Sequence, residues 1–142
     1  MTVQAILESK GHHIVSVTPE ATLASAVKLL AERRIGAVMV MSGQRIDGIL
    51  SERDIVRVIG ERGAASLDEQ VGAVMTRKVV HCRPNDTVAA IMEKMTTGKF
   101  RHLPVVHNDV VVGLISIGDV VKYRVHEFEA EQEALRDYIK TA

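Results

Sequence analysis

The sequence predicts an α/β (α+β) fold in which two β-α-β-β-α repeats pack as a pseudo-two-fold pair. Residues 14–57 align with residues 79–122 at a constant offset of 65 without a gap, and nine of the 44 aligned pairs are identical. In each copy a helical pattern is flanked by short apolar runs. The chain has 142 residues and only four aromatic side chains, so the core must be aliphatic. A repeat of this length indicates one structural unit used twice.

The first two elements of each copy are a short strand and an amphipathic helix. The strands are expected at residues 14–17 and 79–82, ending before Pro19 and Pro84. Thr22 and Thr87 are suitable N-caps for the helices that follow. The apolar positions of both helices recur at i, i+3, i+4 and i+7, the spacing of one helix face: Leu23, Ala26, Val27 and Leu30 in one copy, and Val88, Ile91, Met92 and Met95 in the other.

Two more strands and a second helix complete each copy. Apolar runs at residues 37–41 and 46–50 are separated by Ser42-Gly43-Gln44. The corresponding runs at 103–106 and 110–115 are separated by His107-Asn108-Asp109. Both pairs predict tight hairpins. Ser51 and Ser116 then begin the last helices.

The segment between the copies predicts a boundary at residue 65. Gly60 and Gly63 end a helix, and SLDE at 66–69 is typical of a capping box that begins a short new one. We therefore divide the chain into residues 1–65 and 66–142, the second unit carrying an extended C-terminal helix. Upstream, residues 3–10 align with 71–78 if residues 11–13 are an insertion.

The C-terminal helix carries an apolar stripe with heptad-like spacing and a polar break at Gln132. We expect the stripe to pack on its own domain, and packing on a partner subunit is the alternative. It consists of Val121, Val125, Phe128, Leu135 and Ile139.

Composition excludes several classes of protein. Eighteen basic residues balance eighteen acidic ones, which gives no electrostatic footprint for general nucleic-acid binding. The apolar runs are too short to span a membrane. The start MTVQAILESKG lacks the features of a signal peptide, and the single cysteine, Cys82, fits a reducing compartment. We expect a cytoplasmic protein that binds neither nucleic acid nor membrane.

Each copy places Ser-x-x-Asp after a short apolar run, as GILSERD (48–54) and GLISIGD (113–119). One interpretation is a capping box that only begins a helix. The other is a binding site, because the carboxylate can accept hydrogen bonds from a cis-diol such as ribose. The serine hydroxyl and the free N–H groups of a helix N-terminus suit a phosphate. The two roles are compatible, since a hydroxyl has two lone pairs.

With RHLPVV (101–106) before GLISIGD, the repeats resemble a tandem pair of cystathionine-β-synthase-type (CBS) domains, like the stand-alone CBS-pair proteins of bacteria. The likeness extends from about Val3 to Arg124. It implies a pseudo-two-fold unit with two clefts and a disc-like homodimer. It also implies an adenosine-containing ligand: AMP, ADP, ATP, NAD(H) or S-adenosylmethionine.

The second copy is expected to form the better phosphate site. Arg101 and His102 supply positive charge there, while Gly36 and Ala37 occupy the matching positions of the first copy. Arg53 is expected to reach across the cleft, and pairing with its neighbours Glu52 or Asp54 is the alternative. The full set for this site is Val80, His81, Cys82, Arg101, His102, Pro104, Ser116, Asp119 and Arg53.

The first copy is expected to form a weaker site. Its Ser51 and Asp54 match Ser116 and Asp119, but no Arg-His pair precedes them. The resemblance places the base along the first strand, against backbone and aliphatic groups. The set for this site is Val15, Ser16, Val17, Gly36, Ala37, Ser51 and Asp54.

The sequence carries no convincing catalytic or metal centre. Cys82 and His81 are adjacent on a strand and so point to opposite faces. The histidines match no zinc spacing, and no phosphate-binding Gly-rich loop is present. Our hypothesis is a non-enzymatic sensor that binds an adenine nucleotide and regulates an unidentified protein. The alternatives are a purely structural module for dimerisation or docking and an enzyme acting on a nucleotide.

Overall fold

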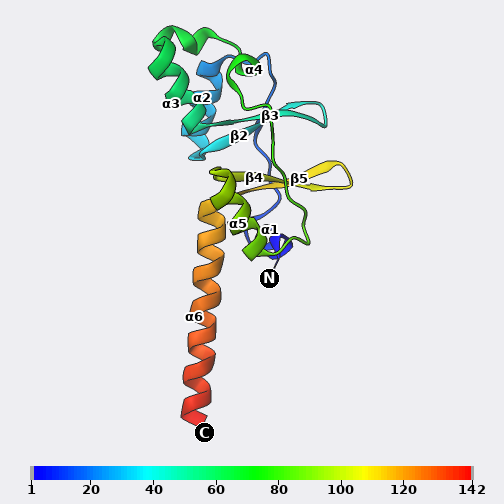
Figure 1. Cartoon of the computed structure of the whole chain (residues 1–142), viewed down its shortest axis with the longest axis vertical. Coiled ribbons are helices and arrows are strands. Elements are labelled where there is room, and N and C mark those ends of the chain that lie inside the picture. Colours follow the sequence, from blue (N-terminus) through cyan, green and yellow to red (C-terminus); the bar gives the residue numbers. More distant parts are fainter. Residues whose placement is uncertain (1, 142) are drawn as a thin grey trace.

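The structure, a computed structural model, describes residues 2–141 and has two lobes with a long helix extending away from one of them (Figure 1). The first repeat forms β1 (Ser16–Val17), α2 (Leu23–Arg33), β2 (Ala37–Ser42), β3 (Arg45–Ser51) and α3 (Glu52–Arg62). The second forms α5 (Val88–Gly98), β4 (His102–His107), β5 (Val110–Ser116) and α6 (Ile117–Thr141). Outside these lie α1 (Val3–Lys10), the 3₁₀ helix η1 (Ala64–Asp68) and α4 (Val71–Val74).

The predicted caps and hairpins are confirmed in both repeats. The Thr22 hydroxyl accepts a hydrogen bond from the Ser25 N–H at 3.2 Å, and the Thr87 hydroxyl accepts one from the Ala90 N–H at 3.1 Å. Strands β2 and β3 pair antiparallel, as do β4 and β5. Both hairpins have a register shift directly after the equivalent Val40 and Val105. The repeats therefore share a local irregularity as well as an element order.

The first strand is shorter than predicted, and in the second repeat only an isolated bridge from Cys82 to Val105 remains. The reason is Pro104. In the first repeat the Met39 N–H donates to the Val15 carbonyl at 3.1 Å, which ties the segment to β2. Pro104 stands where Met39 would and has no N–H to donate to Val80. The prediction of a strand over 79–82 is wrong for this reason.

The segment SLDE does not begin a helix as predicted. The Ser66 hydroxyl donates back to the Gly63 carbonyl at 2.7 Å, which closes a turn of the 3₁₀ helix η1. Helix α4 begins only at Val71, after Gln70.

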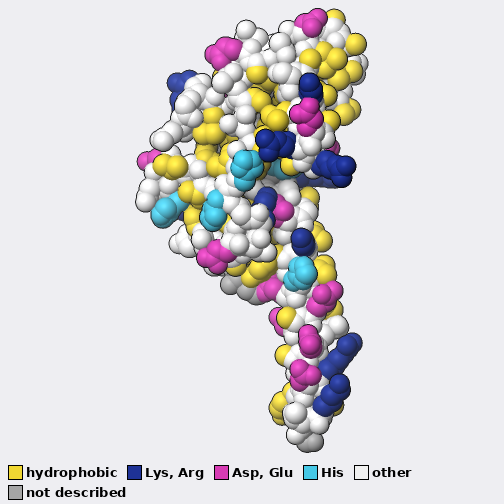
Figure 2. All heavy atoms as spheres, turned by 180° about the vertical axis from the view of Figure 1, so that it is seen from behind, with side chains coloured by type: hydrophobic (Ala, Val, Ile, Leu, Met, Phe, Trp, Pro, Cys, Tyr) yellow, Lys and Arg dark blue, Asp and Glu magenta, His cyan; other side chains and the backbone are white. Residues whose placement is uncertain are grey.

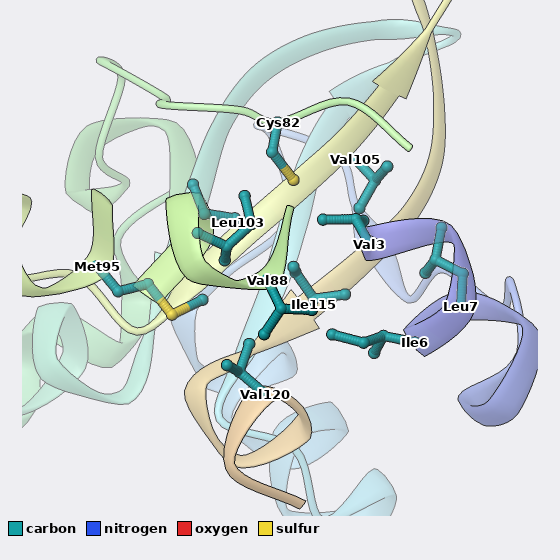
Figure 3. Packing of buried hydrophobic residues seen from close by; sticks show 11 residues of the cluster. Val3, Ile6, Leu7, Cys82, Val88, Met95, Leu103, Val105, Ile115 and Val120 are labelled. Carbon is teal, nitrogen blue, oxygen red and sulfur yellow. The ribbon is translucent and has the colours of Figure 1, made fainter. Parts of the chain in front are cut away.

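The two repeats exchange their leading segments. The α1 residues Val3, Ile6 and Leu7 pack into the core of the second repeat (Figure 3). That core also contains Cys82, Val88, Ile91, Met95, Leu103, Val105, Ile115 and Val120. In return, α4 packs into the first core, which consists of Leu23, Ala26, Leu30, Val38, Val40, Leu50, Ile55, Val58, Val71, Val74 and Met75.

Equivalent hydrogen bonds hold the two exchanged segments. The Val3 N–H donates to the Asp86 carbonyl at 2.9 Å, and the Val71 N–H donates to the Ala21 carbonyl at 2.8 Å. These contacts agree with the alignment of residues 3–10 with 71–78. A division at residue 65 thus separates the sequence repeats but not the packed cores. Helix α1 precedes the first repeat and packs on the second, and α4 precedes the second repeat and packs on the first.

The glycine that precedes each Ser-x-x-Asp marks where the exchanged segment crosses the hairpin. A Cβ on Gly48 would lie 2.6 Å from the Thr76 carbonyl oxygen, and one on Gly113 would lie 2.5 Å from Leu7 Cδ2. Both distances are below van der Waals contact.

The apolar stripe of α6 does not pack on its own domain, so the first interpretation of it is wrong. Tyr123 packs against the second core, but the side chains of the stripe are exposed. Helix α6 projects away from the rest of the chain (Figure 1). Every described residue from 128 to 141 is exposed.

Candidate functional site

Both Ser-x-x-Asp motifs form the predicted capping boxes. The Ser51 N–H donates to Asp54 Oδ2 at 3.0 Å, and the Asp54 N–H donates to the Ser51 hydroxyl at 3.3 Å. The matching distances for Ser116 and Asp119 are 2.8 and 3.2 Å. Each motif therefore satisfies donors at the start of its helix.

Each motif also faces residues of the other repeat, so that two clefts lie between the repeats. The larger, which we call the Asp54 cleft, has a volume of about 620 Å³. It is lined by Gly36, Ile49, Ser51, Glu52, Arg53, Asp54, Arg57, Thr76, Lys78, Val79, Val80, Gly98, Lys99, Phe100, Arg101 and His102. On the face shown in Figure 2, Lys, Arg and His side chains gather at the level where the lobes meet.

The smaller, the Asp119 cleft, has a volume of about 290 Å³. Most of its residues are the repeat equivalents of those in the Asp54 cleft, which supports the predicted pseudo-two-fold relation. It is lined by Lys10, His13, Val15, Arg34, Ile35, Gly36, Ala37, His102, Leu114, Ser116 and Asp119.

This grouping differs from the one expected from sequence. Arg101 was expected beside Asp119, but its side chain lines the Asp54 cleft, and only its carbonyl reaches α6, accepting from the Ile117 N–H at 2.8 Å. His102 lines both clefts. Strand β4 begins beside α6 of its own repeat, but the side chain of Arg101, the residue before β4, faces the other repeat. Sequence alignment alone does not reveal that crossing.

The first-strand residues are divided in the same crossed manner. Val80 lies with Asp54, and Val15 lies with Asp119. Gly36 lines both clefts, while Ala37 lines the Asp119 cleft.

Five of the expected site residues line neither cleft. Cys82 is 1% exposed, packs in the second core, and has its pKa raised to about 12, chiefly by burial. Pro104 is buried, and Ser16 and Val17 lie along β1 outside both clefts. His81 lines a separate hollow beside the β4–β5 turn.

Arg53 does reach the other repeat. Its Nη1 donates to the Lys99 carbonyl at 3.3 Å, and it pairs with neither Glu52 nor Asp54. Arg57 is the residue that pairs with Asp54, at 3.0 Å.

Two lysines outside both expected sets of site residues lie in the clefts. Lys10 Nζ lies 2.6 Å from Asp119 Oδ2 and 2.7 Å from the Leu114 carbonyl oxygen. Lys78, its repeat equivalent, lines the Asp54 cleft. Their recurrence at aligned positions was the signal that could have identified them. No comparable signal pointed to Thr76, Lys99 or Phe100.

The two aspartates differ in how much of the carboxylate is free. Asp54 is 4% exposed and accepts from Ser51, Arg57 and Thr76, so both of its oxygens are engaged. Asp119 accepts through Oδ2 from Lys10 and Ser116. Burial raises the pKa of Asp119, but the hydrogen bonds from these two residues outweigh it and hold the pKa below its usual value. Asp119 is thus ionised at neutral pH.

The two clefts also differ in charge. The Asp54 cleft contains five Lys and Arg residues against two acids, and the Asp119 cleft contains two against one. Burial lowers the pKa of His102 more than the nearby Glu52 and Asp119 raise it. His102 is therefore neutral at neutral pH, which corrects the expectation that it supplies positive charge.

Between residues 2 and 141, no cluster of three or more His, Cys, Asp or Glu side chains is arranged to hold a metal ion. No described helix combines the length and apolar character needed to cross a membrane.

The CBS domain family matches the chain twice, over residues 9–61 and 71–126. A mitochondrial CBS domain-containing protein of Arabidopsis thaliana is 34% identical over 98% of this chain and 72% of that protein. Another CBS domain-containing Arabidopsis protein is 35% identical, but the chain spans only 21% of its length.

Solved structures agree. A CBS-domain-containing protein from Agrobacterium tumefaciens is 43% identical with a TM-score of 0.86, covering 87% of this chain and 99% of that one. A CBS domain protein from Pyrobaculum aerophilum, solved as a complex with AMP, is 28% identical with a TM-score of 0.74, covering 84% and 89%. The chain belongs to the CBS domain family and carries two CBS domains in tandem.

Proposed function

We propose that this protein is a non-enzymatic, cytoplasmic regulatory module that binds an adenine nucleotide between its CBS domains. Occupancy then alters how the protein, acting as a homodimer, contacts the protein it regulates, because the ligand binds one arrangement of the domains more tightly. The observation that carries the proposal is the charge of the Asp54 cleft. Within residues 2–141, four of its basic side chains have no ion-pair partner: Arg53, Lys78, Lys99 and Arg101.

Unpaired basic groups that share a cleft with the first residues of α3 favour a phosphate. The same cleft offers an apolar region for a base, formed by Ile49, Val79, Val80 and Phe100. Val80 is 40% exposed, and Pro104 leaves its carbonyl without the N–H that Met39 supplies to Val15 in the other repeat. An adenine amino group needs such an acceptor. The structure with AMP from Pyrobaculum aerophilum supports this ligand class.

The charge of the cleft also ranks the candidate ligands. AMP, ADP, ATP and NAD(H) bring phosphates that the basic residues can neutralise. S-adenosylmethionine brings a sulfonium and an ammonium group and no phosphate, so we expect it to bind more weakly in the Asp54 cleft. The Asp119 cleft is a separate place, and its partly exposed carboxylate suits the ribose diol of a second ligand molecule bound there.

Calorimetric titration with AMP, ATP, NADH and S-adenosylmethionine tests the proposal. We expect AMP to bind and Arg101→Gln to weaken it about tenfold or more, because a charged hydrogen bond to phosphate is lost. Arg83→Gln is the matched control, since Arg83 lies in neither cleft. If no member of the panel binds below millimolar concentration, the nucleotide-binding proposal is wrong.

A second candidate is a structural module without a ligand. The complete capping boxes and the fully engaged Asp54 carboxylate favour it. Asp119→Asn separates the two candidates. If the carboxylate binds ribose, we expect weaker binding in the Asp119 cleft alone, with an unchanged circular-dichroism spectrum. A cap alone predicts a small loss of stability and no effect on a ligand in either cleft.

A further inference from the structure

We propose that the projecting part of α6 pairs with the same helix of a second copy as a parallel, in-register two-stranded coiled coil. This inference rests on the homodimer in the proposed function and adds its surface and orientation. It does not depend on whether either cleft binds a nucleotide.

The seam of the coiled coil is the exposed stripe of α6. Its spacing alternates between four and three residues when Gln132 is included, which is the a and d pattern of a heptad. The side chains of the stripe are 50–65% exposed in the single chain. They are Val121, Val125, Phe128, Leu135 and Ile139.

A helix this exposed has little reason to persist alone. The fully exposed part of α6, residues 128–141, is about as short as the isolated helices that are marginal in water, so its stability depends on packing of its apolar face. Figure 2 shows the projecting end of α6 standing clear of the body, with apolar side chains along it. The first repeat provides an internal comparison: Gly60 and Gly63 occupy the positions of Val125 and Phe128, and α3 ends at Arg62, just before Gly63. The helix continues only in the copy that carries the seam.

The charges beside the seam select the orientation. In a parallel in-register pair, the residue directly before each a position (the g position) meets the residue five positions later on the partner helix (the e position). Glu131 then meets Arg136, and Arg124, which in the single chain pairs with Glu127 at 3.2 Å, meets Glu129, so that both contacts are attractive and occur twice by symmetry.

The antiparallel arrangement with the greatest overlap is disfavoured. When Gln132 of one copy lies opposite Phe128 of the other, Glu131 meets Glu131 of the other copy and Glu129 meets Glu129 of the other copy. Both contacts are repulsive. The parallel arrangement instead places Gln132 against Gln132, where two amides can hydrogen-bond. A polar residue at an a position is a known device for specifying register and a two-stranded state.

Cysteine cross-linking tests the orientation in the full-length protein. We expect Gln132→Cys to form a disulfide-linked dimer on mild oxidation, because the two side chains face each other across the seam. Glu133→Cys is the control, since position 133 lies on the outer face of the same turn. Cys82 can remain, because it is buried. Failure of Gln132→Cys to cross-link, or equal cross-linking of Glu133→Cys, would overturn the proposal.

Charge reversal tests the pairing by a second measurement. Arg136 has no ion-pair partner within residues 2–141 of its own chain. We expect Arg136→Glu to raise the dimer dissociation constant about tenfold, because symmetry doubles each attractive contact turned repulsive. Adding Glu131→Arg restores the pairing and should recover the wild-type value in sedimentation equilibrium.

The outcomes separate this inference from the proposed function. A dimer that is insensitive to both substitutions overturns the coiled coil and leaves the homodimer standing. A protein that stays monomeric at all concentrations overturns both. Loss of nucleotide binding in the calorimetric titration bears on the clefts alone.

Discussion

His102 lines both clefts between the repeats. Its ring is close enough to Gly36 that a Cβ there would lie 3.2 Å from Nε2. Glu52, Asp119, Lys10 and Arg101 are the charged groups that act on it. Burial dominates these influences and keeps the ring neutral. The negative charge of a bound ligand would stabilise the protonated ring and so raise the pKa of His102.

We expect the pKa of His102 to lie below 6.5 in the folded protein and to rise when AMP binds. The unfolded chain then binds more protons than the native state as pH falls through about 6.5, so His102 lowers the free energy of unfolding on the acid side. NMR titration of the histidine Cε1–H resonances measures the pKa, with His102→Gln providing the assignment. A pKa above 6.5 in the free protein would contradict this account.

Asp119 acts in the same direction at lower pH. Its pKa is depressed in the folded state, so its contribution to stability is present above the unfolded value near 3.9 and is lost as pH falls through the folded value.

At the scale of elements, the hairpin and the exchanged segment meet at a single glycine in each repeat. The equivalent positions differ in what lies against them. Gly48 faces the backbone carbonyl of Thr76, whose N–H and C=O both pair with Ile49. Gly113 faces the methyl end of Leu7. The Thr76 carbonyl is held in place by its hydrogen bond, while the end of the Leu7 side chain can rotate.

We therefore expect Gly48→Ala to reduce the free energy of unfolding by about 1–3 kcal/mol, and Gly113→Ala to cost less. Urea denaturation of the two variants beside wild type measures the difference. Equal effects, or a larger effect at Gly113, would show that rigidity of the neighbour does not decide the outcome.

At the scale of the whole molecule, the exchange of α1 and α4 joins the repeats into one unit. Leu7 is fully buried in the second core although it belongs to the first repeat in sequence. A truncation that removed α1 would consequently damage the repeat farther along the chain.

Leu7→Ala tests this exchange. We expect a loss of about 2–5 kcal/mol in the free energy of unfolding, from lost burial and the cavity left behind. Hydrogen exchange should rise first in β4 and β5. Leu30→Ala, in the first core, is the matched variant and should affect β2 and β3 instead. The exchange would be refuted if Leu7→Ala loosened β2 and β3 as much as β4 and β5.

The sequence by itself determined the duplication, the hairpins, the helix caps and the family. These depend on local patterns, because Thr22 caps its helix and Ser51 pairs with Asp54 within a few residues. Only the tertiary structure decided which residues share a cleft. Arg101 joins Asp54 because its side chain faces the other repeat, and Lys10 joins Asp119 because α1 packs into the second repeat. No local pattern encodes either crossing. The exposure of the α6 stripe was likewise decided by the length of the helix beyond the core, which leaves Phe128 and the residues after it without a surface of their own domain to pack on.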